Sequence, residues 1–373
     1  GAQWFPQAKL NFAANLLKYK DEQTALVFCG EDGHRHQISY AQLYTRVAQL
    51  TAGLKAYNIK PGDRIAGFMP NVIDAVAAML ATTSLGAVWS SCSPDFGING
   101  VLDRFGQIKP RILFTTDGYL YNGKRLNSLE RVASIAKQLD SIEAIVVSDH
   151  IGTKVDLSAL NAIVPNKAMH WDDFVDASTS EIDFVDCNFS DPLYIMYSSG
   201  TTGVPKCIVH SVGGTLLQHN KEHLLHTNVS RDDVLFYYTT CGWMMWNWLV
   251  SGLALGCSVV LYDGSPFKTP SILMDMAQNE AVSIFGTSAK YIAALEKIGQ
   301  KPIQSHDLRA LKSILSTGSP LSHESFDYVY QQVKTDVMLC SISGGTDIVS
   351  CFALGCPILP VYRGELQCAG LGM

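Results

Sequence analysis

Short apolar, β-prone segments alternate with helix-like segments along most of the chain, and this alternation limits the folds it can adopt. An apolar run is centred on Ile65 to Met69, and Asn71 can then cap a helix whose apolar side carries Val72, Val76, Met79 and Leu80. Further strand-like segments are GAVWSSCSP, RILFTT, EAIVVS, LYIMYSS, SIFGTS, LKSILSTGS and DVMLCSISGGTD. Because strands that alternate with helices form βαβ units, the sequence predicts an α/β fold with largely parallel sheets.

The alternation is interrupted once, between residues 150 and 190. This stretch is more polar and irregular, and it ends in the acidic run EIDFVDCNFSD. We therefore predict a first α/β subdomain over residues 1–190, with a leading segment and a linker, and a second over residues 191–373. The two are expected to form one composite domain.

Charge and cysteine content narrow the class of protein. The net charge is −6 and the 28 lysines and arginines are scattered, which argues against a general nucleic-acid-binding protein. The ten cysteines include no Cys-x-x-Cys pair, and several lie in apolar runs, as buried free thiols do. We therefore expect a reduced, cytoplasmic protein. No sequence feature specifies an oligomeric state.

Residues 241–262, CGWMMWNWLVSGLALGCSVVLY, carry no charge and are long enough to form a membrane-spanning helix. The stretch nevertheless contains polar side chains and glycines, and GCSVVLYDG has the pattern of a turn followed by a β-branched strand. We predict a buried helix followed by a buried strand, and no membrane span.

The decapeptide YSSGTTGVPK, residues 197–206, follows directly from the strand-like segment LYIMYSS. Ligand loops of open α/β sheets lie at such strand ends. Gly200 and Gly203 permit a tight turn, and successive backbone N–H groups with four hydroxyls form a donor surface suited to phosphate oxygens. Lys206 adds a positive charge. Only two residues separate the glycines, so the segment is a phosphate loop without the Walker A spacing.

This stretch resembles the phosphate-binding motif of the adenylate-forming acyl-CoA synthetase superfamily, Tyr-Ser/Thr-Ser-Gly-Ser/Thr-Thr-Gly-x-Pro-Lys-Gly. Three more blocks match in order: TTCGWMMWNW resembles the acyl-pocket block, STGSP the adenine block and SISGGTD the Thr-Glu block. WFPQAKLNFAANLL resembles the leading segment of the acetyl-CoA synthetase branch. Within that branch the resemblance is greatest to its acetoacetate-activating members, and it rests on YSSGTTGVPKCIVH, CGWMMWNWLVSGLALG, SGGTDIVSCF and PVYRGELQCAGLGM.

The resemblance implies ligation of a small carboxylic acid to coenzyme A at the expense of ATP, through an acyl-adenylate, with AMP and pyrophosphate as products. The residues that it assigns to the ATP phosphates are Ser198, Ser199, Gly200, Thr201, Thr202, Gly203 and Lys206. Those that it assigns to the adenine are Gly318, Ser319 and Pro320, followed by Gly345, Thr346 and Asp347 near the α-phosphate. Thr201 and Asp347 would bind Mg²⁺, and Thr201, Lys206, Thr346 and Asp347 would be the catalytic residues.

Three positions depart from the family pattern. Cys207 stands where the family usually has glycine, and Asp347 where it usually has glutamate; an aspartate still offers the hard oxygen ligands that Mg²⁺ prefers. Gly344 stands where acetate-specific relatives place a tryptophan that closes the acyl pocket. With Trp243, Met244 and Met245 as an adaptable lining, the pocket is expected to accept a longer acid such as acetoacetate.

Two further expectations follow from the resemblance. Lys124, in the segment NGK, occupies the place of basic residues that contact the 3′-phosphate of coenzyme A, although a solvated loop lysine fits the segment equally well. The family also completes its chemistry with a small C-terminal domain that carries a lysine. The chain ends at GELQCAGLGM, before that domain, so we expect a truncated core with weak adenylation or none.

The sequence is also compatible with three different functions. HNKEH, residues 219–223, fits the H-x-x-E-H pattern of a zinc peptidase, with His219 and His223 on one helix face and His226 one turn further on. A phosphate loop would equally serve a non-catalytic nucleotide-binding protein. An open acyl pocket would also suit a synthetase that activates propionate or butyrate.

Overall fold

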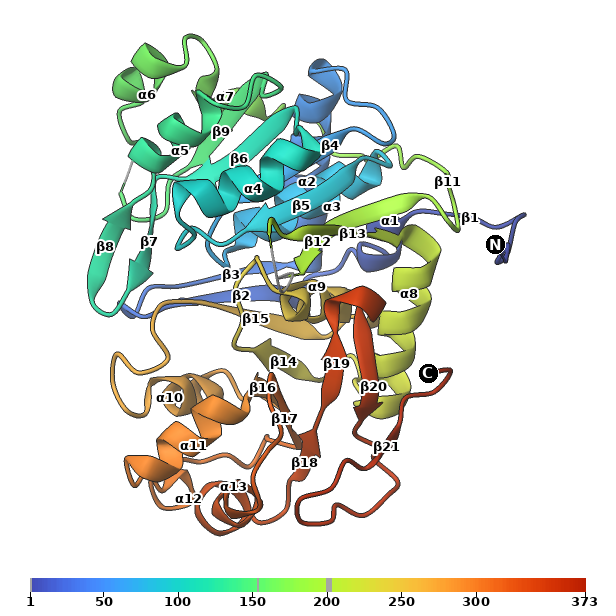
Figure 1. Ribbon diagram of the computed structural model, residues 1–373, viewed down its shortest axis with the longest axis vertical. Helices are drawn as coiled ribbons and strands as arrows, with labels where there is room; N and C mark the ends of the chain where they lie inside the picture. The colour runs from blue at the N-terminus through green and yellow to red at the C-terminus, as the bar shows by residue number, and fades with distance from the viewer. Residues whose placement is uncertain (1, 153, 199–202) are drawn as a thin grey trace.

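Two sheets of seven strands form the frame of the molecule, one above the other in Figure 1. The computed structural model describes residues 2–152, 154–198 and 203–373. In each sheet six strands run parallel, and one strand at an edge pairs antiparallel with its neighbour. The predicted α/β fold with largely parallel sheets is confirmed.

The first sheet occupies the upper half of Figure 1. Its strands, in spatial order, are β10 (Ala168–His170), β9 (Ala144–Ser148), β6 (Ile112–Thr116), β4 (Arg64–Phe68), β5 (Val88–Cys92), β12 (Pro192–Ser198) and β13 (Lys206–Ser211). The outer face of this sheet is covered by α4 (Ile98–Ile108), α5 (Leu129–Ala136) and α6 (Ser158–Ile163).

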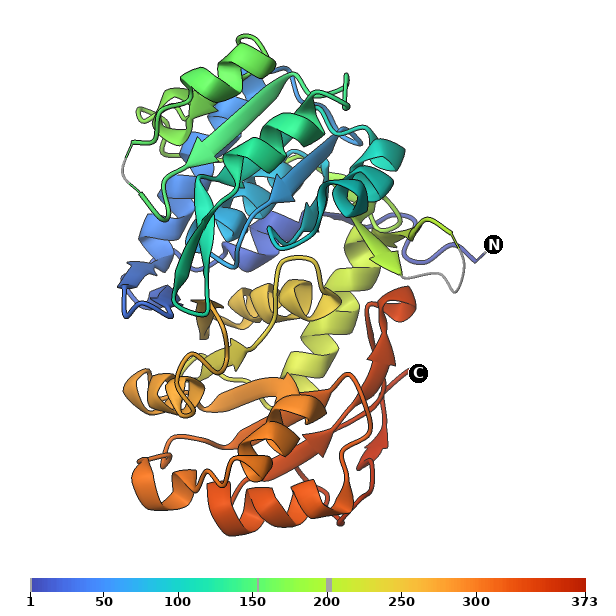
Figure 2. The same cartoon turned by 60° about the vertical axis from the view of Figure 1, so that its left-hand side comes forward.

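The second sheet lies below the first. Its strands, in spatial order, are β18 (Met338–Ser341), β17 (Ser313–Thr317), β16 (Ile284–Ser288), β14 (Val234–Tyr237), β15 (Ser258–Asp263), β2 (Thr24–Gly30) and β3 (Arg35–Ser39). Its outer face is covered by α10 (Ile272–Asn279), α11 (Ala289–Lys297) and α13 (His323–Tyr328), which Figure 2 shows in orange.

A middle layer of helices joins the two sheets. It consists of α1 (Phe12–Leu16), α2 (Tyr40–Ala56), α3 (Ile73–Ser84) and α9 (Met244–Ser251), while α8 (Val212–Lys221) runs along one side of both sheets. Every residue of α3 except Asp74 is buried, because α3 contacts β2 of one sheet and β4 and β5 of the other. One continuous hydrophobic core therefore connects both sheets through these helices.

Shorter elements complete the fold. They are strands β1 (Lys9–Leu10), β7 (Gly118–Tyr121), β8 (Lys124–Asn127), β11 (Cys187–Asn188), β19 (Ser343–Gly345), β20 (Ser350–Leu354) and β21 (Cys368–Ala369), and helices α7 (Trp171–Phe174) and α12 (Pro302–Ser305). Two π-helical segments, η1 (Glu222–His226) and η3 (Val329–Val333), continue α8 and α13, and two 3₁₀ segments are η2 (Gly252–Leu255) and η4 (Thr346–Ile348). Strands β19, β20 and β21 form a small sheet beside the second large one.

The sheets do not follow the order of the chain. Strands β2 and β3, from residues 24–39, belong to the second sheet, whereas β12 and β13, from residues 192–211, belong to the first. The division at residue 190 thus remains a prediction about subdomains, while the sheets themselves are interleaved in sequence. The interval 150–190 also contains α6, β10, α7 and β11.

Two local expectations had different outcomes. Residues 241–262 form a buried helix, α9, and a buried strand, β15, as predicted. In the described part of the chain, no helix combines the length and apolar character that crossing a membrane requires. The prediction that Asn71 caps a helix was wrong: α3 has Val72 at its N-cap, and the Asn71 side chain accepts a hydrogen bond from Trp246 Nε1 at 2.9 Å.

Candidate active site

Loops at the carboxyl ends of parallel strands meet at one cavity of about 570 Å³. The loop after β17 contributes the adenine block, the segment after β18 contributes β19 and η4, and the loop after β14 leads into α9. The lining residues among those predicted from the sequence are Trp243, Met244, Met245, Gly318, Ser319, Pro320, Gly344, Gly345 and Thr346. The fold thus gathers three separate sequence blocks around a cavity of the size that small-molecule sites have.

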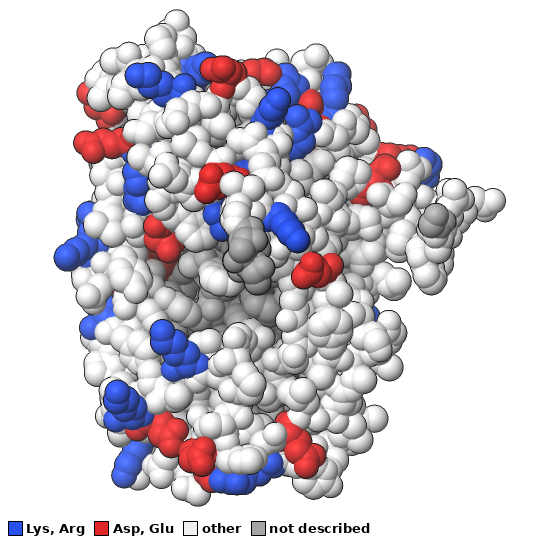
Figure 3. Space-filling view, in the orientation of Figure 1, with Lys and Arg blue, Asp and Glu red and all other residues white. Residues whose placement is uncertain are grey.

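The cavity is also lined by residues to which the sequence analysis assigned no role. Ser341 ends β18 and Ile342 follows it, Cys351 comes from β20, and Gly364 and Leu366 come from the C-terminal segment. Figure 3 shows the face of the molecule hollowed near its middle, with basic and acidic side chains scattered around the hollow. All five residues lie within segments that carry the family resemblance, so their place near the site could have been inferred from the sequence.

The phosphate loop itself lies mostly outside the described residues, since Ser199, Gly200, Thr201 and Thr202 are not among them. Its two ends are close together, because Ser198 on β12 and Lys206 on β13 are direct partners in the antiparallel pair. Gly203 has φ +97°, a conformation that favours glycine. Lys206 is exposed.

A histidine connects this loop to the Thr346 segment. His210 lies on β13 and shares a strand face with Lys206, four residues earlier. Its Nε2–H donates to the carbonyl oxygen of Thr346 at 2.7 Å, and burial lowers the pKa of this imidazole. The strand that leaves the phosphate loop is therefore attached to the backbone that presents Thr346 and Asp347.

Asp347 lies in η4, and its carboxylate is exposed beside the cavity. Within residues 2–152, 154–198 and 203–373, no group of three His, Cys, Asp or Glu side chains is arranged to hold a metal ion. Among the described residues, no side chain or backbone group hydrogen-bonds to this carboxylate. An exposed carboxylate of this kind fits Mg²⁺, which keeps several waters and usually binds one or two protein carboxylates together with substrate phosphates. Thr201, the other predicted ligand, lies outside the described residues.

The structure gives a different reason for the glycine at position 344 from the one that the sequence indicated. This glycine lines the cavity, but a Cβ built on it would lie 2.2 Å from the carbonyl oxygen of Ser350 and 2.6 Å from Cα of Cys351. The pairing of β19 with β20, in which Gly344 faces Cys351, brings the two backbones this close. The missing side chain therefore permits a close strand approach, and an indole at this position would require a different backbone. A Cβ at Gly345 would meet no atom of the described residues within 4 Å.

A second cavity, of about 310 Å³, lies between the hairpin of β7 and β8 and the loop after β14. Its lining includes tyrosines from both sides, Tyr119, Tyr121, Tyr238 and Tyr262. Thr239 and Thr240 also line it, and they precede Trp243 of the first cavity by only a few residues. Asn71 Nδ2 and Thr240 Oγ1 are buried there without a hydrogen-bond partner among the described residues, as polar atoms of a ligand site can be.

The β7–β8 hairpin carries Lys124, which is exposed. The two central residues of its turn, Asn122 and Gly123, have φ of 51° and 77°, as the Asn-Gly turn of a tight hairpin requires. Their N–H groups donate to the buried Glu31 carboxylate at 2.9 and 2.5 Å. The turn next to Lys124 is therefore held by a carboxylate from the other sheet.

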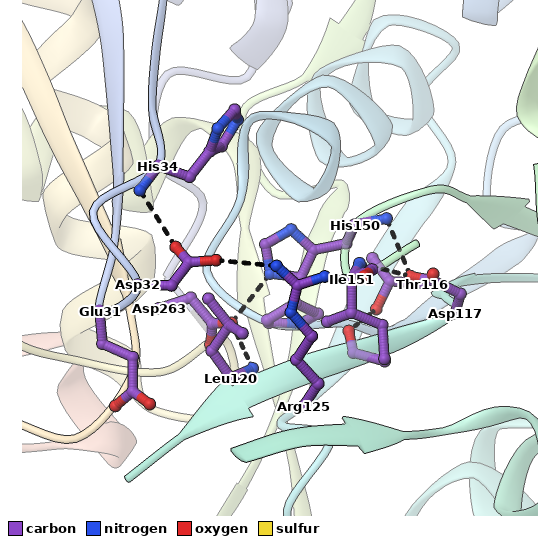
Figure 4. A network of polar contacts seen from close by, with 12 residues as sticks. Glu31, Asp32, His34, Thr116, Asp117, Leu120, Arg125, His150, Ile151 and Asp263 are labelled. Carbon is purple, nitrogen blue, oxygen red and sulfur yellow. Dashed lines mark hydrogen bonds and ion pairs between the residues drawn. The ribbon is translucent and has the colours of Figure 1, made fainter. Parts of the chain in front are cut away.

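More polar contacts hold this hairpin and the segments next to it (Figure 4). Asp263, at the end of β15, accepts from Leu120 N at 2.8 Å and pairs with His150 Nε2 at 2.9 Å. Asp117 accepts from the backbone N–H groups of His150 and Ile151 at 2.8 and 3.0 Å. Acids from both sheets thus fix the hairpin, and no sequence motif marks any of them.

The zinc-peptidase function is contradicted by the contacts of HNKEH. His219 donates from Nε2 to Val349 O at 2.9 Å, and its Nδ1 meets Ser251 Oγ at 2.7 Å. His223 donates from Nε2 to Trp248 O at 2.9 Å. Both imidazoles are buried, and burial lowers the pKa of His219 to about 3 and that of His223 to about 4. These side chains serve internal hydrogen bonds and do not converge on a metal.

Comparisons with known proteins agree with this arrangement. The chain is 52% identical over 373 residues to an acetoacetyl-coenzyme A synthetase of Rhizobium meliloti (strain 1021), covering all of this chain and 57% of that protein. It is 48% identical over 380 residues to the acetoacetyl-CoA synthetase of Gallus gallus, covering all of this chain and 56% of the relative. The solved acetoacetyl-CoA synthetase from Streptomyces lividans superposes with a TM-score of 0.93 at 42% identity, over all of this chain and 57% of that one.

The chain thus spans a little over half the length of these relatives. The profile of the family described as AMP-binding enzyme matches residues 12–362, which include every block around the cavity. With that match over almost its whole length, the chain belongs to the AMP-binding enzyme family.

Proposed function

We propose that this chain is the nucleotide- and acid-binding core of an AMP-forming acid–CoA ligase that activates acetoacetate. The observation that carries the proposal is the single cavity on which the adenine block, the acyl block and Thr346 converge. The named relatives and the solved structure, all acetoacetyl-CoA synthetases, support the same reaction.

The reaction has two steps. In the first, a carboxylate oxygen of the acid attacks the α-phosphorus of ATP, and pyrophosphate leaves. In the second, the thiol of coenzyme A attacks the acyl carbonyl carbon, the thiol proton is released, and AMP leaves. Such transfers depend mainly on positioning and on neutralisation of phosphate charge.

We assign the protein groups by their place around the cavity. Gly318, Ser319 and Pro320 flank the adenine, and Thr346 contacts the α-phosphate. Lys206, together with the loop from Ser198 to Gly203, binds the β- and γ-phosphates. Mg²⁺, when bound, neutralises phosphate charge and orients the pyrophosphate, and Asp347 supplies a carboxylate for it.

The acid is expected to lie between Trp243, Met244 and Met245 on one side and Gly344 on the other. Methionine side chains adapt to acids of different shape. Acetoacetate has both a methyl end and a ketone, and the cavity offers apolar lining next to backbone groups of β19. Propionate and butyrate are the competing acids of the same class.

Coenzyme A is proposed to approach along the second cavity. That cavity extends from the Lys124 hairpin toward the loop that leads to Trp243. Asn71 Nδ2 and Thr240 Oγ1 could donate to the amide carbonyls of the pantetheine arm. The exposed Lys124, at the start of β8 beside the turn, would lie near the 3′-phosphate.

This assignment predicts a selective effect of Lys124→Ala. A charge-assisted contact to a phosphate at an exposed site should raise KM for coenzyme A about fivefold. KM for dephospho-coenzyme A, which lacks the 3′-phosphate, should not change. Lys137→Ala, at an exposed position outside the hairpin, is the control. An equal effect on both thiols, or no effect on either, would remove Lys124 from the coenzyme A site.

The proposed reaction is tested by acid-dependent ATP–pyrophosphate exchange. The assay uses both the chain as it stands and the full-length gene product, with Mg²⁺ and acetoacetate. Exchange that requires the acid supports the ligase. Tight ATP binding without acid-dependent exchange in either protein would favour a non-catalytic nucleotide-binding protein.

We infer a cytoplasmic location from the thiols. All ten cysteines, each within the described residues, are free in this fold, and burial raises the pKa of the most enclosed ones, such as Cys92 and Cys241. Free, unreactive thiols of this kind are typical of a reducing compartment.

A further inference from the structure

The buried acid of HNKEH, Glu222, is a feature that the reaction itself does not use. It is the first residue of the π-helical segment η1, and its side chain is 1% exposed. Lys221 Nζ is 3.9 Å from Oε1, which leaves neutral donors as the closest partners of this carboxylate. Burial of a carboxylate is costly unless several hydrogen bonds compensate it, so its contacts indicate what it does.

The two carboxylate oxygens contact different elements. Oε2 accepts from Trp248 Nε1, on α9, at 2.9 Å. Oε1 accepts from the backbone N–H of Cys351, on β20, at 3.3 Å and from the Ser350 hydroxyl. One side chain therefore connects α9 to β20.

These two elements are the opposite walls of the first cavity. Trp248 follows Met244 and Met245 by four and three residues, so all three lie near one another on α9. On the other side, Cys351 lines the cavity and faces Gly344 across the β19–β20 pair, while Ser350 faces Gly345.

Neighbouring side chains reinforce the same connection. His219 joins Ser251 at the end of α9 to Val349, which directly precedes β20, and His223 contacts Trp248 O. Gln218 donates to Glu222 Oε1 at 3.3 Å and to the Ser350 hydroxyl. Gln218 and His219 lie in the last turn of α8, and Glu222 and His223 lie in the π-helical segment η1 that continues it, a kind of turn that often occurs at functional sites.

We propose that Glu222 is a positioning residue for the acid substrate, which sets the separation between the α9 wall and the β20 wall of the acyl pocket. The inference rests on the proposed function of that pocket. Hydrogen bonds to a charged group are stronger than neutral ones and fix geometry more closely, which suits a carboxylate to this role.

Two conservative variants test the proposal in the full-length gene product. Glu222→Gln keeps the shape of the side chain but has one acceptor oxygen, so it can accept hydrogen bonds from α9 or from β20 but not from both. Trp248→Phe keeps an aromatic ring but removes the N–H that contacts Oε2, together with the five-membered part of the indole. In both, we expect KM for acetoacetate to rise about tenfold, while KM for ATP changes less than about twofold.

A matched control lies on the same helical segment. His226 is buried and bonds to Gly355 O and to the backbone N–H of Leu371, which are not part of the acyl pocket. His226→Leu should therefore lower the melting temperature as much as the Glu222 variant does, yet leave the ratio of the two KM values unchanged.

The possible outcomes distinguish a failure of the proposed ligase function from a failure of the proposed role of Glu222. If Glu222→Gln and Trp248→Phe change KM for acetoacetate and KM for ATP equally, or change neither, Glu222 does not position the acid. If the unmodified protein shows no acid-dependent exchange with any acid, both the proposed ligase and the role of Glu222 are overturned. A selective rise in KM for the acid, absent in His226→Leu, establishes the role.

Discussion

The free energy of unfolding is expected to fall steeply as the pH drops below about 6.5, because two buried histidines are neutral in the native state. The folded-state pKa values of His219 and His223 are lowered to about 3 and about 4 by burial, whereas the unfolded chain protonates near pH 6.5. Above pH 6.5 both states are neutral at these positions, and the full stability is present. Between pH 6.5 and the folded pKa values, only the unfolded state gains protons, so stability is lost as the pH falls.

The expected loss of unfolding free energy is large. For each unit that the pH falls, one such histidine lowers the free energy of unfolding by up to about 1.4 kcal/mol, and the pair lowers it by up to roughly 2.7 kcal/mol near pH 5. Because other groups also titrate in this pH range, the contribution of the two histidines is measured as the difference between the wild type and a variant that lacks both. Urea unfolding between pH 5 and 8 is compared for the wild type and for His219→Gln/His223→Gln. The pH slope of the variant should be flatter, whatever its absolute stability. Parallel slopes would show that these imidazoles do not control the acid sensitivity.

Replacing Gly344 by alanine is expected to damage the site far more than the same change at the next residue. In Gly344→Ala the new Cβ overlaps the backbone of Ser350 and Cys351, which cannot move like a flexible side chain. We expect a loss of about 3 kcal/mol in stability. The relaxation should shift β19 and with it Thr346, so kcat for adenylation should fall as well.

Gly345→Ala is the matched control. Within the part of the chain that the structure describes, its Cβ meets no atom within 4 Å, and Gly345 has φ −170°, an extended conformation that any residue adopts. The control should change stability by less than about 0.5 kcal/mol. The prediction is tested by comparing the melting temperatures and the acid-dependent exchange rates of Gly344→Ala and Gly345→Ala. Similar melting temperatures for both would mean that β19 and β20 are not held as close as described.

Local sequence patterns predicted where the strands lie in the chain better than which strands pair with one another. The apolar runs around Ile65 and Val260 became buried strands because a strand of such residues is stable only within a sheet. That β2 pairs with β15, more than 200 residues away, could not be predicted from either segment, because pairing of this kind depends on the whole assembly. For the same reason the sheets are interleaved in sequence.

Asn71 and the two histidines of HNKEH show the limit of prediction from local sequence patterns. Asn71 has the character of a helix cap, but the N–H of Trp246 in the other half of the chain uses its side-chain oxygen. The histidines of HNKEH have metal-ligand spacing, yet their partners are backbone carbonyls of Val349 and Trp248, which are distant in sequence. Tertiary partners, and not spacing, determined the role in both cases.

The candidate site was predictable in part. The blocks around Gly318, Trp243 and Thr346 carry their own sequence signatures, and the fold places them on one cavity. The supports of the site, among them His210, Glu31 and Glu222, act through backbone groups of other elements. Such contacts leave no local pattern, so only the structure reveals them.

The acid specificity of the full-length gene product tests the proposed function most directly. We would measure kcat/KM for thioester formation with acetate, propionate, butyrate, 3-hydroxybutyrate and acetoacetate, in the presence of ATP, Mg²⁺ and coenzyme A. We expect acetoacetate to be preferred over acetate by at least about tenfold, as extra pocket contacts allow. A preference for acetate would contradict the open acyl pocket and the substrate assignment.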